Sequence, residues 1–213
     1  YPGAWFFQLQ RALEAVTGQG LGQLVRERVF TPLGLGASSL VWQEGYGDRI
    51  ARPHRRGGEP GDPRTIELGG RLLGHASSTG RPLESWRHAD VVAAFGALPG
   101  TPPAMPVFFS PNAAGSLITT APEYARFAMV AGGAAQGPLA EPFRRQLFGV
   151  TTPIQGPLAW GLGGGLELEG DAPRGAWHWG DNPGYKNFVL VDLREAAGLV
   201  VLTNGDNGRA VYE

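Results

Sequence analysis

Apolar residues recur at helical spacing near the start of the chain. The pattern is carried by positions close to i, i+4, i+8 and i+11: Trp5, Leu9, Leu13 and Val16. It predicts a helix over residues 4–17 with one apolar face, and Gly18 is a residue typical of a helix end. A second short helix follows, with apolar residues at Leu21, Leu24, Val25 and Val29. We expect Pro32 and the turn PLGLG to end it.

The middle of the chain lacks a sustained hydrophobic period. Residues 45–106 are rich in Gly, Pro, Arg and Ser, and only the segment from Trp86 to Leu98 has a helical pattern. The composition predicts long surface loops with one helical segment. Loops of this length often form the walls of a binding site.

The last part of the chain predicts two helices and then strands. Thr120 is placed to cap a helix, with Pro122 in its first turn and Glu123 completing a capping box. A fourth helix is expected over residues 139–148. Strand patterns then cover residues 159–168, 175–179, 185–193 and 198–203. The short turns between them favour antiparallel pairing.

These elements together predict an α+β fold. We expect one antiparallel sheet flanked by helices, with helices 4–17 and 120–132 packed against it, and residues 1–213 forming a single domain. A chain of 213 residues with 42% hydrophobic content is long enough to bury one substantial core.

Composition removes several classes of function. The formal net charge is −1, without the clustered basic residues that phosphate backbones require, so nucleic acid is a poor candidate partner. The absence of cysteine excludes disulfides and thiolate chemistry. No apolar run approaches the length of a membrane-spanning helix. Lys186 is the only lysine, so a mechanism that needs a lysine of low pKa has one candidate.

Four other patterns have ordinary structural readings. The four histidines lack the spacing of a metal site, so we expect no metal and no cofactor. Residues 204–208, NGDNG, predict a turn rather than a calcium loop. Residues 161–165, GLGGG, predict a glycine-rich strand beside a cleft rather than a phosphate loop. The six tryptophans indicate core packing, and a lectin remains a weak alternative.

The stretch HWGDNPGYKN, residues 178–187, has two readings. Trp177, His178 and Trp179 alternate along a predicted strand, so His178 points away from the side that carries both indoles. Gly180 allows a second backbone to approach closely. The stretch is therefore either the structural edge of a hairpin or the wall of a site that stabilises an oxyanion.

Five motifs in a fixed order favour the second reading. They follow one another as YPGAWFFQLQRALEAVTG, VFTPLGL, AAGSLITTAPEYARF, WGLG with HWGDNPGYK, and VVLTNGDNG. Their order resembles the class C β-lactamase-like serine hydrolases, a family that includes penicillin-binding DD-peptidases, D-aminopeptidases and esterases. The resemblance covers nearly the whole chain, but only the later part of that family's domain. The domain represented here is therefore expected to be incomplete.

The resemblance implies roles for particular residues. Tyr1 matches a tyrosine that assists proton transfer, although Gly3 stands where the family has an asparagine. His178, Trp179 and Gly180 match the strand that lines the opposite wall, and we expect Tyr1 to lie near His178. The backbone N–H of Asp181 matches a donor of the oxyanion hole. The implied reaction is acyl transfer from an ester, amide or D-amino-acid peptide bond, with an esterase or D-peptidase favoured over an efficient β-lactamase.

The nucleophile of the family is missing from its expected place. No serine is followed by lysine three residues later, and Ser116 is interpreted as a structural serine before a helix. Either an upstream segment of the same protein carries the Ser-x-x-Lys motif, which we favour, or the chain is a relative without a nucleophile that binds peptides or β-lactams. The expected ligand is a small molecule or peptide. The resemblance suggests an exported protein, while the chain shows no export signal.

Overall fold

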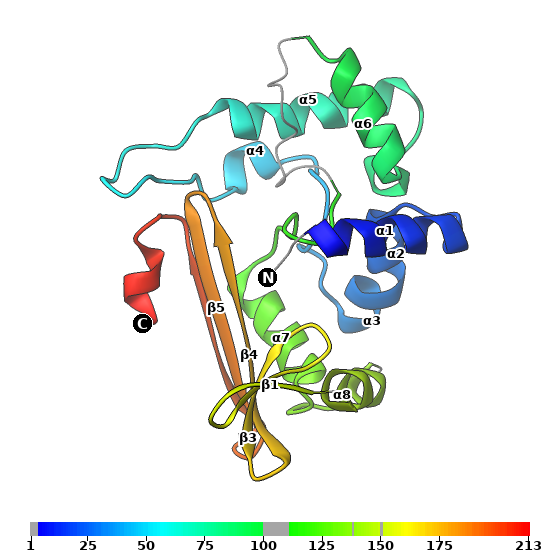
Figure 1. The fold of residues 1–213 in the computed structure, drawn as a ribbon. Helices are drawn as coiled ribbons and strands as arrows, with labels where there is room; N and C mark the ends of the chain where they lie inside the picture. Colours follow the sequence, from blue (N-terminus) through cyan, green and yellow to red (C-terminus); the bar gives the residue numbers. More distant parts are fainter. Residues whose placement is uncertain (1–3, 100–110, 138, 150) are drawn as a thin grey trace. The chain divides into compact units, whose positions relative to one another are not determined.

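The computed structural model describes residues 4–213 apart from 100–110, 138 and 150 (Figure 1). The chain divides into two compact units. The first consists of residues 1–52 and 60–119 and the second of residues 53–59 and 120–213. Whether the two units make up one domain, as the sequence predicts, remains a prediction.

The first unit is helical. Its elements are α1 (Ala4–Thr17), α2 (Leu21–Val25), a π-helical turn (Arg26–Phe30), α3 (Thr31–Leu33), α4 (Tyr46–Arg49), α5 (Arg64–Ser78), a 3₁₀ turn (Leu83–Ser85) and α6 (His88–Ala97). Its core is a cluster of nine buried residues: Val41, Trp42, Ile66, Leu72, Ala76, Leu83, Trp86, Val91 and Ala94. Trp42 and Trp86 are therefore core residues, as the sequence predicts.

Helix α1 has the predicted bounds, but its buried residues are polar. Trp5 is 70% exposed and Val16 is 88% exposed, whereas Gln10 and Glu14 are buried. Both polar side chains have hydrogen-bond partners, which is what allows them to lie inside the protein. The predicted packing of this helix on the sheet involves both units, and it stays a prediction.

The second predicted helix extends slightly beyond its expected end. Helices α2 and α3 and the π-helical turn between them follow one another without a break from Leu21 to Leu33. Pro32 lies in the first turn of α3, directly after the π-helical turn, and does not stop the helix. The helix ends instead at Gly34, whose φ of 66° is in the left-handed region.

Helix α5 corrects the prediction of a loop-rich middle segment. Its fifteen residues include Gly69, Gly70 and Gly74, and these glycines obscure the helical pattern in the sequence. Gly69 has a packing role, because a Cβ atom at this position would lie 2.5 Å from Cε3 of Trp42. The glycine that weakens the sequence signal is thus the residue that lets the helix approach the core. The predicted segment near Trp86 is confirmed as α6.

The second unit contains α7 (Ala121–Ala131), α8 (Ala140–Gly149) and a six-stranded sheet. The strands are β1 (Thr152–Gln155), β2 (Leu158–Trp160), β3 (Gly165–Glu169), β4 (Ala172–Asn182), β5 (Tyr185–Asp192) and β6 (Ala197–Thr203). They lie in sequence order, and each neighbouring pair is antiparallel. The α+β fold class is therefore confirmed, and both helices of this unit were predicted.

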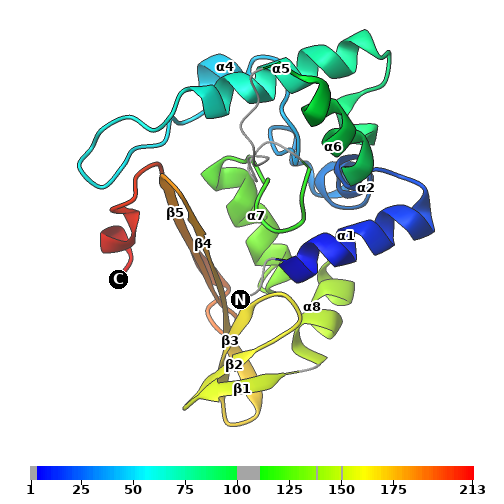
Figure 2. The same cartoon turned by 45° about the horizontal axis from the view of Figure 1, so that its top comes forward.

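Helix α7 packs on one face of this sheet (Figures 1 and 2). Thr120 caps the helix as predicted, since its side-chain oxygen accepts a hydrogen bond from the N–H of Glu123. Ala128 of the helix forms a buried core with Val189 and Val191 of β5. In the second unit, the predicted packing of a helix on the sheet is thus confirmed.

The strand prediction for residues 159–168 was wrong in detail. Residues 161–164 form a turn between β2 and β3, in which the N–H of Gly161 donates to the carbonyl oxygen of Gly164. Gly165, the first residue of β3, leaves room for an indole, because a Cβ atom there would lie 2.2 Å from the ring of Trp177. GLGGG is therefore a turn followed by the start of a strand rather than a continuous strand. Strand β1 was not predicted.

Candidate active site

His178 lies in the second half of β4, the longest strand of the sheet. It pairs with Val189 of β5, and Trp177 and Trp179 pair with Leu190 and Phe188. Alternation along the strand would place His178 on the face that carries Val189 and both indoles on the other face. The ring of His178 nevertheless contacts Trp160 and Trp179, so the prediction that it points away from the indoles stays a prediction.

The imidazole contacts Trp160 and Trp179, which form a cluster with Trp177. The rings of Trp177 and Trp179 are stacked with their centroids 5.4 Å apart. Trp160 of β2 lies 5.7 Å from His178 and contacts both of these indoles as well. Trp179 is 38% exposed, which corrects the expectation that it is a buried packing residue. The cluster gives His178 a largely apolar environment.

This environment affects the charge of His178. Burial lowers the pKa of the imidazole from its usual value of 6.5 and outweighs a hydrogen bond with the backbone of Trp179, which acts in the opposite direction. His178 is therefore largely neutral at pH 7. A neutral imidazole can donate and accept hydrogen bonds but offers no full positive charge to a carboxylate.

Asp181 belongs to a group of ion pairs at the tip of β4 and β5. Its carboxylate contacts Nζ of Lys186 at 2.7 Å and also pairs with Arg209. Nζ of Lys186 lies 3.3 Å from Oδ1 of Asp206 and donates to the carbonyl oxygen of Asn182 at 2.8 Å. The hydrogen bond from Lys186 lowers the pKa of Asp181 most strongly, and Arg209 adds to it.

The same ion pairs determine the protonation of Lys186, the only lysine. Partial burial lowers the pKa of Lys186, but the hydrogen bonds to Asp181 and Asp206 outweigh this effect, so its pKa is raised. An ammonium group that is held by two carboxylates is a poor proton acceptor. Lys186 is therefore not the low-pKa lysine that the sequence left open. Asp206 lies in the predicted 204–208 turn, which is confirmed by a hydrogen bond from the N–H of Gly208 to the carbonyl oxygen of Gly205.

Three of the serines are buried and hydrogen-bonded. Oγ of Ser116 donates to the carbonyl oxygen of Asn112 and accepts from its N–H, both at 2.9 Å. Ser38 contacts Oγ1 of Thr119 at 2.7 Å. Ser39 accepts from the N–H of Val41 and from the amide of Gln43. Ser116 is thus structural, as the sequence indicates, and closes a compact loop.

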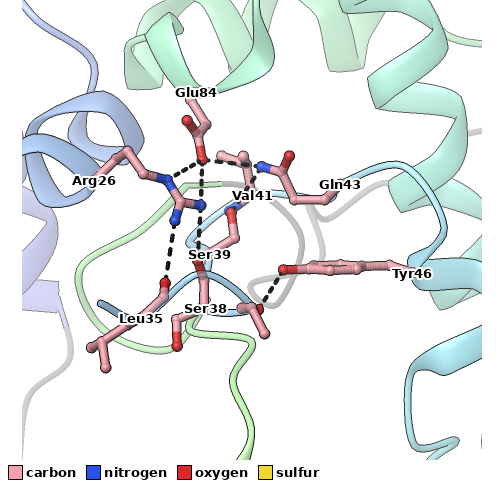
Figure 3. A network of polar contacts seen from close by, with 9 residues as sticks. Arg26, Leu35, Ser38, Ser39, Val41, Gln43, Tyr46 and Glu84 are labelled. Carbon is pink, nitrogen blue, oxygen red and sulfur yellow. Dashed lines mark hydrogen bonds and ion pairs between the residues drawn. The ribbon is translucent and has the colours of Figure 1, made fainter. Parts of the chain in front are cut away.

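Figure 3 shows the polar network around Ser39. Oε1 of Glu84 accepts hydrogen bonds from Arg26 and from Gln43. Arg26 also donates to the carbonyl oxygens of Leu35 and Ser38. The guanidinium of Arg26 therefore ties residues 35–43 to the short helical turn that carries Glu84. These contacts support the backbone on both sides of the buried serines.

The remaining described serines belong to local helical structure. Ser77, Ser78 and Ser85 each donate to a backbone carbonyl oxygen three or four residues earlier. No serine among residues 4–99, 111–137, 139–149 and 151–213 forms a hydrogen bond with Lys186. The described part of the chain therefore contains no Ser–Lys pair. Tyr1 and Ser110 lie outside the described residues.

Gln10 and Glu14 form a buried site that the sequence did not single out. The carboxylate of Glu14 accepts hydrogen bonds from the N–H groups of Leu21 and His88, which are the first residues of α2 and α6. An anion at two helix starts is favoured by their dipoles. Gln10 donates to Glu14 and to the carbonyl oxygen of Pro111. In the sequence, the signal for this site is the four-residue spacing of Gln10 and Glu14, which places both side chains on one face of a helix.

Two further observations limit other kinds of function. Within the described residues, no group of three or more His, Asp or Glu side chains is arranged to hold a metal ion. Over the same residues, no helix combines the length and apolar character required to cross a membrane. The expectation of a site without metal or cofactor stays a prediction.

A family model described as Beta-lactamase matches residues 4–212. No curated protein sequence matches the chain. Among solved structures, a penicillin-binding protein from Bacillus halodurans is 14% identical with a TM-score of 0.64, and the match covers 99% of this chain and 55% of that one.

Two further structures are similar at comparable levels. The D-alanine carboxypeptidase AmpC from Burkholderia cenocepacia is 15% identical with a TM-score of 0.65, covering 99% of this chain and 58% of its own. A D-stereospecific amidohydrolase from Streptomyces is 16% identical with a TM-score of 0.58, covering 97% and 50%. At these identities the structures establish the fold alone. The chain spans little more than half the length of the first structures it matches.

Proposed function

Because the chain belongs to the β-lactamase family, we propose that it forms the later part of a serine hydrolase that acts through an acyl-enzyme. The substrate is an ester, an amide or a D-amino-acid peptide bond. The observation that carries the proposal is the position of the HWG sequence in β4, where a neutral His178 precedes Gly180 and Asp181 toward the end of a central strand.

The proposed reaction has two steps. A serine supplied by an upstream segment attacks the carbonyl carbon, and the alcohol or amine leaves with a proton that Tyr1 relays. Backbone N–H groups, including that of Asp181, stabilise the oxyanion. Water then attacks the acyl-serine, releases the acid and regenerates the serine.

The lowered pKa of His178 supports a preference among substrates. In this position, a charged lysine would attract a substrate carboxylate, whereas a neutral imidazole contributes only hydrogen bonds. We therefore favour esters and D-amino-acid amides over β-lactams whose recognition depends on a carboxylate. Family membership alone does not determine the substrate.

The second candidate is a binding module without catalysis. It is supported by the absence of a Ser–Lys pair from the described residues and by the ion-paired state of Lys186. Such a module would keep the wall formed by β4 and bind peptides or β-lactams reversibly.

Hydrolysis assays on a longer protein that includes the upstream coding sequence distinguish the two candidates. We expect it to release p-nitrophenol from a p-nitrophenyl ester or to cleave a D-amino-acid amide, while residues 1–213 alone do neither. The longer protein with its Ser-x-x-Lys serine changed to alanine is the matched control. Reversible binding without turnover by the longer protein would favour the binding module.

A further inference from the structure

The backbone N–H that the proposed function assigns to the oxyanion hole lies close to the turn between β4 and β5. Asn182 and Tyr185 pair across this two-residue turn. Asp181 and Lys186 form the next pair. Residues that flank such a turn exchange backbone hydrogen bonds and the next pair does not, because the two kinds of pair alternate along an antiparallel ladder. The N–H of Asp181 therefore points away from β5, toward the side on which β3 pairs with β4 only as far as Trp177.

The side chain of Asp181 is held from two directions. Its carboxylate contacts Nζ of Lys186, on the neighbouring strand β5, at 2.7 Å. It also pairs with Arg209 of the 3₁₀ turn (Gly208–Val211), which lies beside β5 (Figure 1). Two cations from two different elements thus hold one carboxylate, and they limit the movement of the residue whose N–H points out of the ladder.

Lys186 is the better buried of the two cations. Its side chain is 12% exposed, whereas that of Arg209 is 48% exposed. Nζ of Lys186 also contacts Oδ1 of Asp206 at 3.3 Å and donates to the carbonyl oxygen of Asn182 at 2.8 Å. An ammonium group has three donors, so these three contacts use all of them. Lys186 therefore binds both the side chain of Asp181 and the backbone of the residue that follows it.

Asp206 connects these contacts to a segment that is distant in sequence. Its Oδ1 accepts a hydrogen bond from the N–H of Gly184, in the β4–β5 turn, at 2.7 Å. Its own backbone N–H donates to the carbonyl oxygen of His54 at 3.0 Å, and the N–H of His54 donates to the carbonyl oxygen of Asn204 at 2.8 Å. The turn at residues 204–208 is thus fixed on one side by His54 and supports the β4–β5 turn on the other.

We propose that Lys186 and Arg209 are positioning residues for the oxyanion hole, because they hold the carboxylate of Asp181 and so fix the direction of its backbone N–H. The inference rests on the proposed function and gives the only lysine a role other than proton transfer. An oxyanion donor acts at about 2.7–3.1 Å from the developing charge, and a displacement of about 1 Å can slow a reaction about a hundredfold. The loss should appear in kcat, because the charge develops only in the transition state.

Hydrolysis of a p-nitrophenyl ester by the longer protein tests this proposal. In Lys186→Met, which removes the charge, we expect kcat to fall about tenfold or more while KM stays within about twofold. Arg209→Gln should lower kcat less, and its exposed position makes it the second variant if Lys186→Met does not fold. Arg194→Met is the matched control with unchanged kcat, since it breaks an exposed ion pair with Glu169 beyond the other end of β5.

A double variant shows whether Lys186 acts through Asp181. Asp181→Asn keeps the backbone N–H but removes the carboxylate, so adding Lys186→Met to it should cause little further loss of kcat. A loss in the double variant equal to the product of the two single losses would mean that the residues act independently and would overturn the proposal.

Two other results would also overturn the proposal. Full kcat in both Lys186→Met and Arg209→Gln, even with a lowered Tm, would show that these ion pairs only stabilise the fold, while the proposed function would stand. A longer wild-type protein that hydrolyses neither an ester nor a D-amino-acid amide would defeat the proposed function and this inference together, and that result is seen before any variant is made.

Discussion

His178 is the residue on which the proposed chemistry most depends. It combines ring contacts with Trp160 and Trp179 with a position toward the end of a central strand. In a longer, active protein, His178→Ala removes a hydrogen-bonding group from the reacting substrate. Since such a bond is worth roughly 1.5–3 kcal/mol, kcat/KM should fall about ten- to a hundredfold, with little change in Tm. A variant with full activity would show that His178 is structural.

Trp179→Ala should behave differently from His178→Ala. A fully buried tryptophan would cost about 3 kcal/mol or more when truncated, but Trp179 is 38% exposed. We expect a smaller loss of stability, mostly from the stacked pair with Trp177, which contributes about 0.5–1.5 kcal/mol. Urea unfolding of both variants measures the difference. A loss above about 3 kcal/mol would mean that Trp179 is buried after all.

The pH dependence of stability provides an independent test of His178. Its pKa in the folded protein lies below 6.5, so the unfolded chain binds the proton more readily. The favourable contribution of the neutral imidazole is present above pH 6.5 and is lost as the pH falls toward the folded pKa. The variant His178→Gln should lose less stability than the wild type between pH 7 and pH 5. An equal loss of stability in the two proteins between pH 7 and pH 5 would contradict this expectation.

At the residue scale, the sequence identified His178 but not its neighbours in space. Alternation along a strand requires only local geometry, so the shared face of Trp177 and Trp179 could be predicted. The contact with Trp160 could not, because it depends on the register of β2, β3 and β4. The pairing of Lys186 with Asp206 likewise depends on where the 204–208 turn meets the strands.

At the scale of elements, α5 offers a matched pair of glycines. Gly69→Ala would place a Cβ atom 2.5 Å from the ring of Trp42, and such overpacking costs about 1–3 kcal/mol. Gly74→Ala meets nothing within 4 Å and should stabilise the helix by roughly 0.5–1 kcal/mol. Urea unfolding of both variants tests the packing of α5 on Trp42. Equal effects of the two substitutions would exclude this contact.

Elements with strong local signals were predicted well. Helices α1, α7 and α8 and strands β5 and β6 have clear periodicity or a capping residue, and their bounds lie close to those expected. Helix α5 and the β2–β3 turn were missed because glycine weakens a helical pattern and also occurs in strands. In both places a tryptophan ring occupies the space that a side chain would need, and such a contact cannot be read from spacing.

At the scale of the whole molecule, the account depends on the family. The predicted helices and strands indicated the α+β fold and the order of motifs indicated the β-lactamase family, and the family model confirms the family over residues 4–212. The predicted site residues His178, Trp179, Gly180 and Asp181 follow one another along β4, and Tyr1 lies outside the described residues. The role of Tyr1 was implied by the family resemblance alone, because composition and periodicity carry no information on long-range contacts.

Active-site labelling of residues 1–213 tests the central claim most directly. The chain is incubated with a fluorescent penicillin or an activated ester, and the intact protein is then measured by mass spectrometry. Because the described serines are buried or bonded within local structure and Lys186 is ion-paired, we expect no stable adduct. A longer protein with the upstream segment should take up one equivalent. A stoichiometric adduct on Ser116, or on any other serine of residues 1–213, would contradict the account.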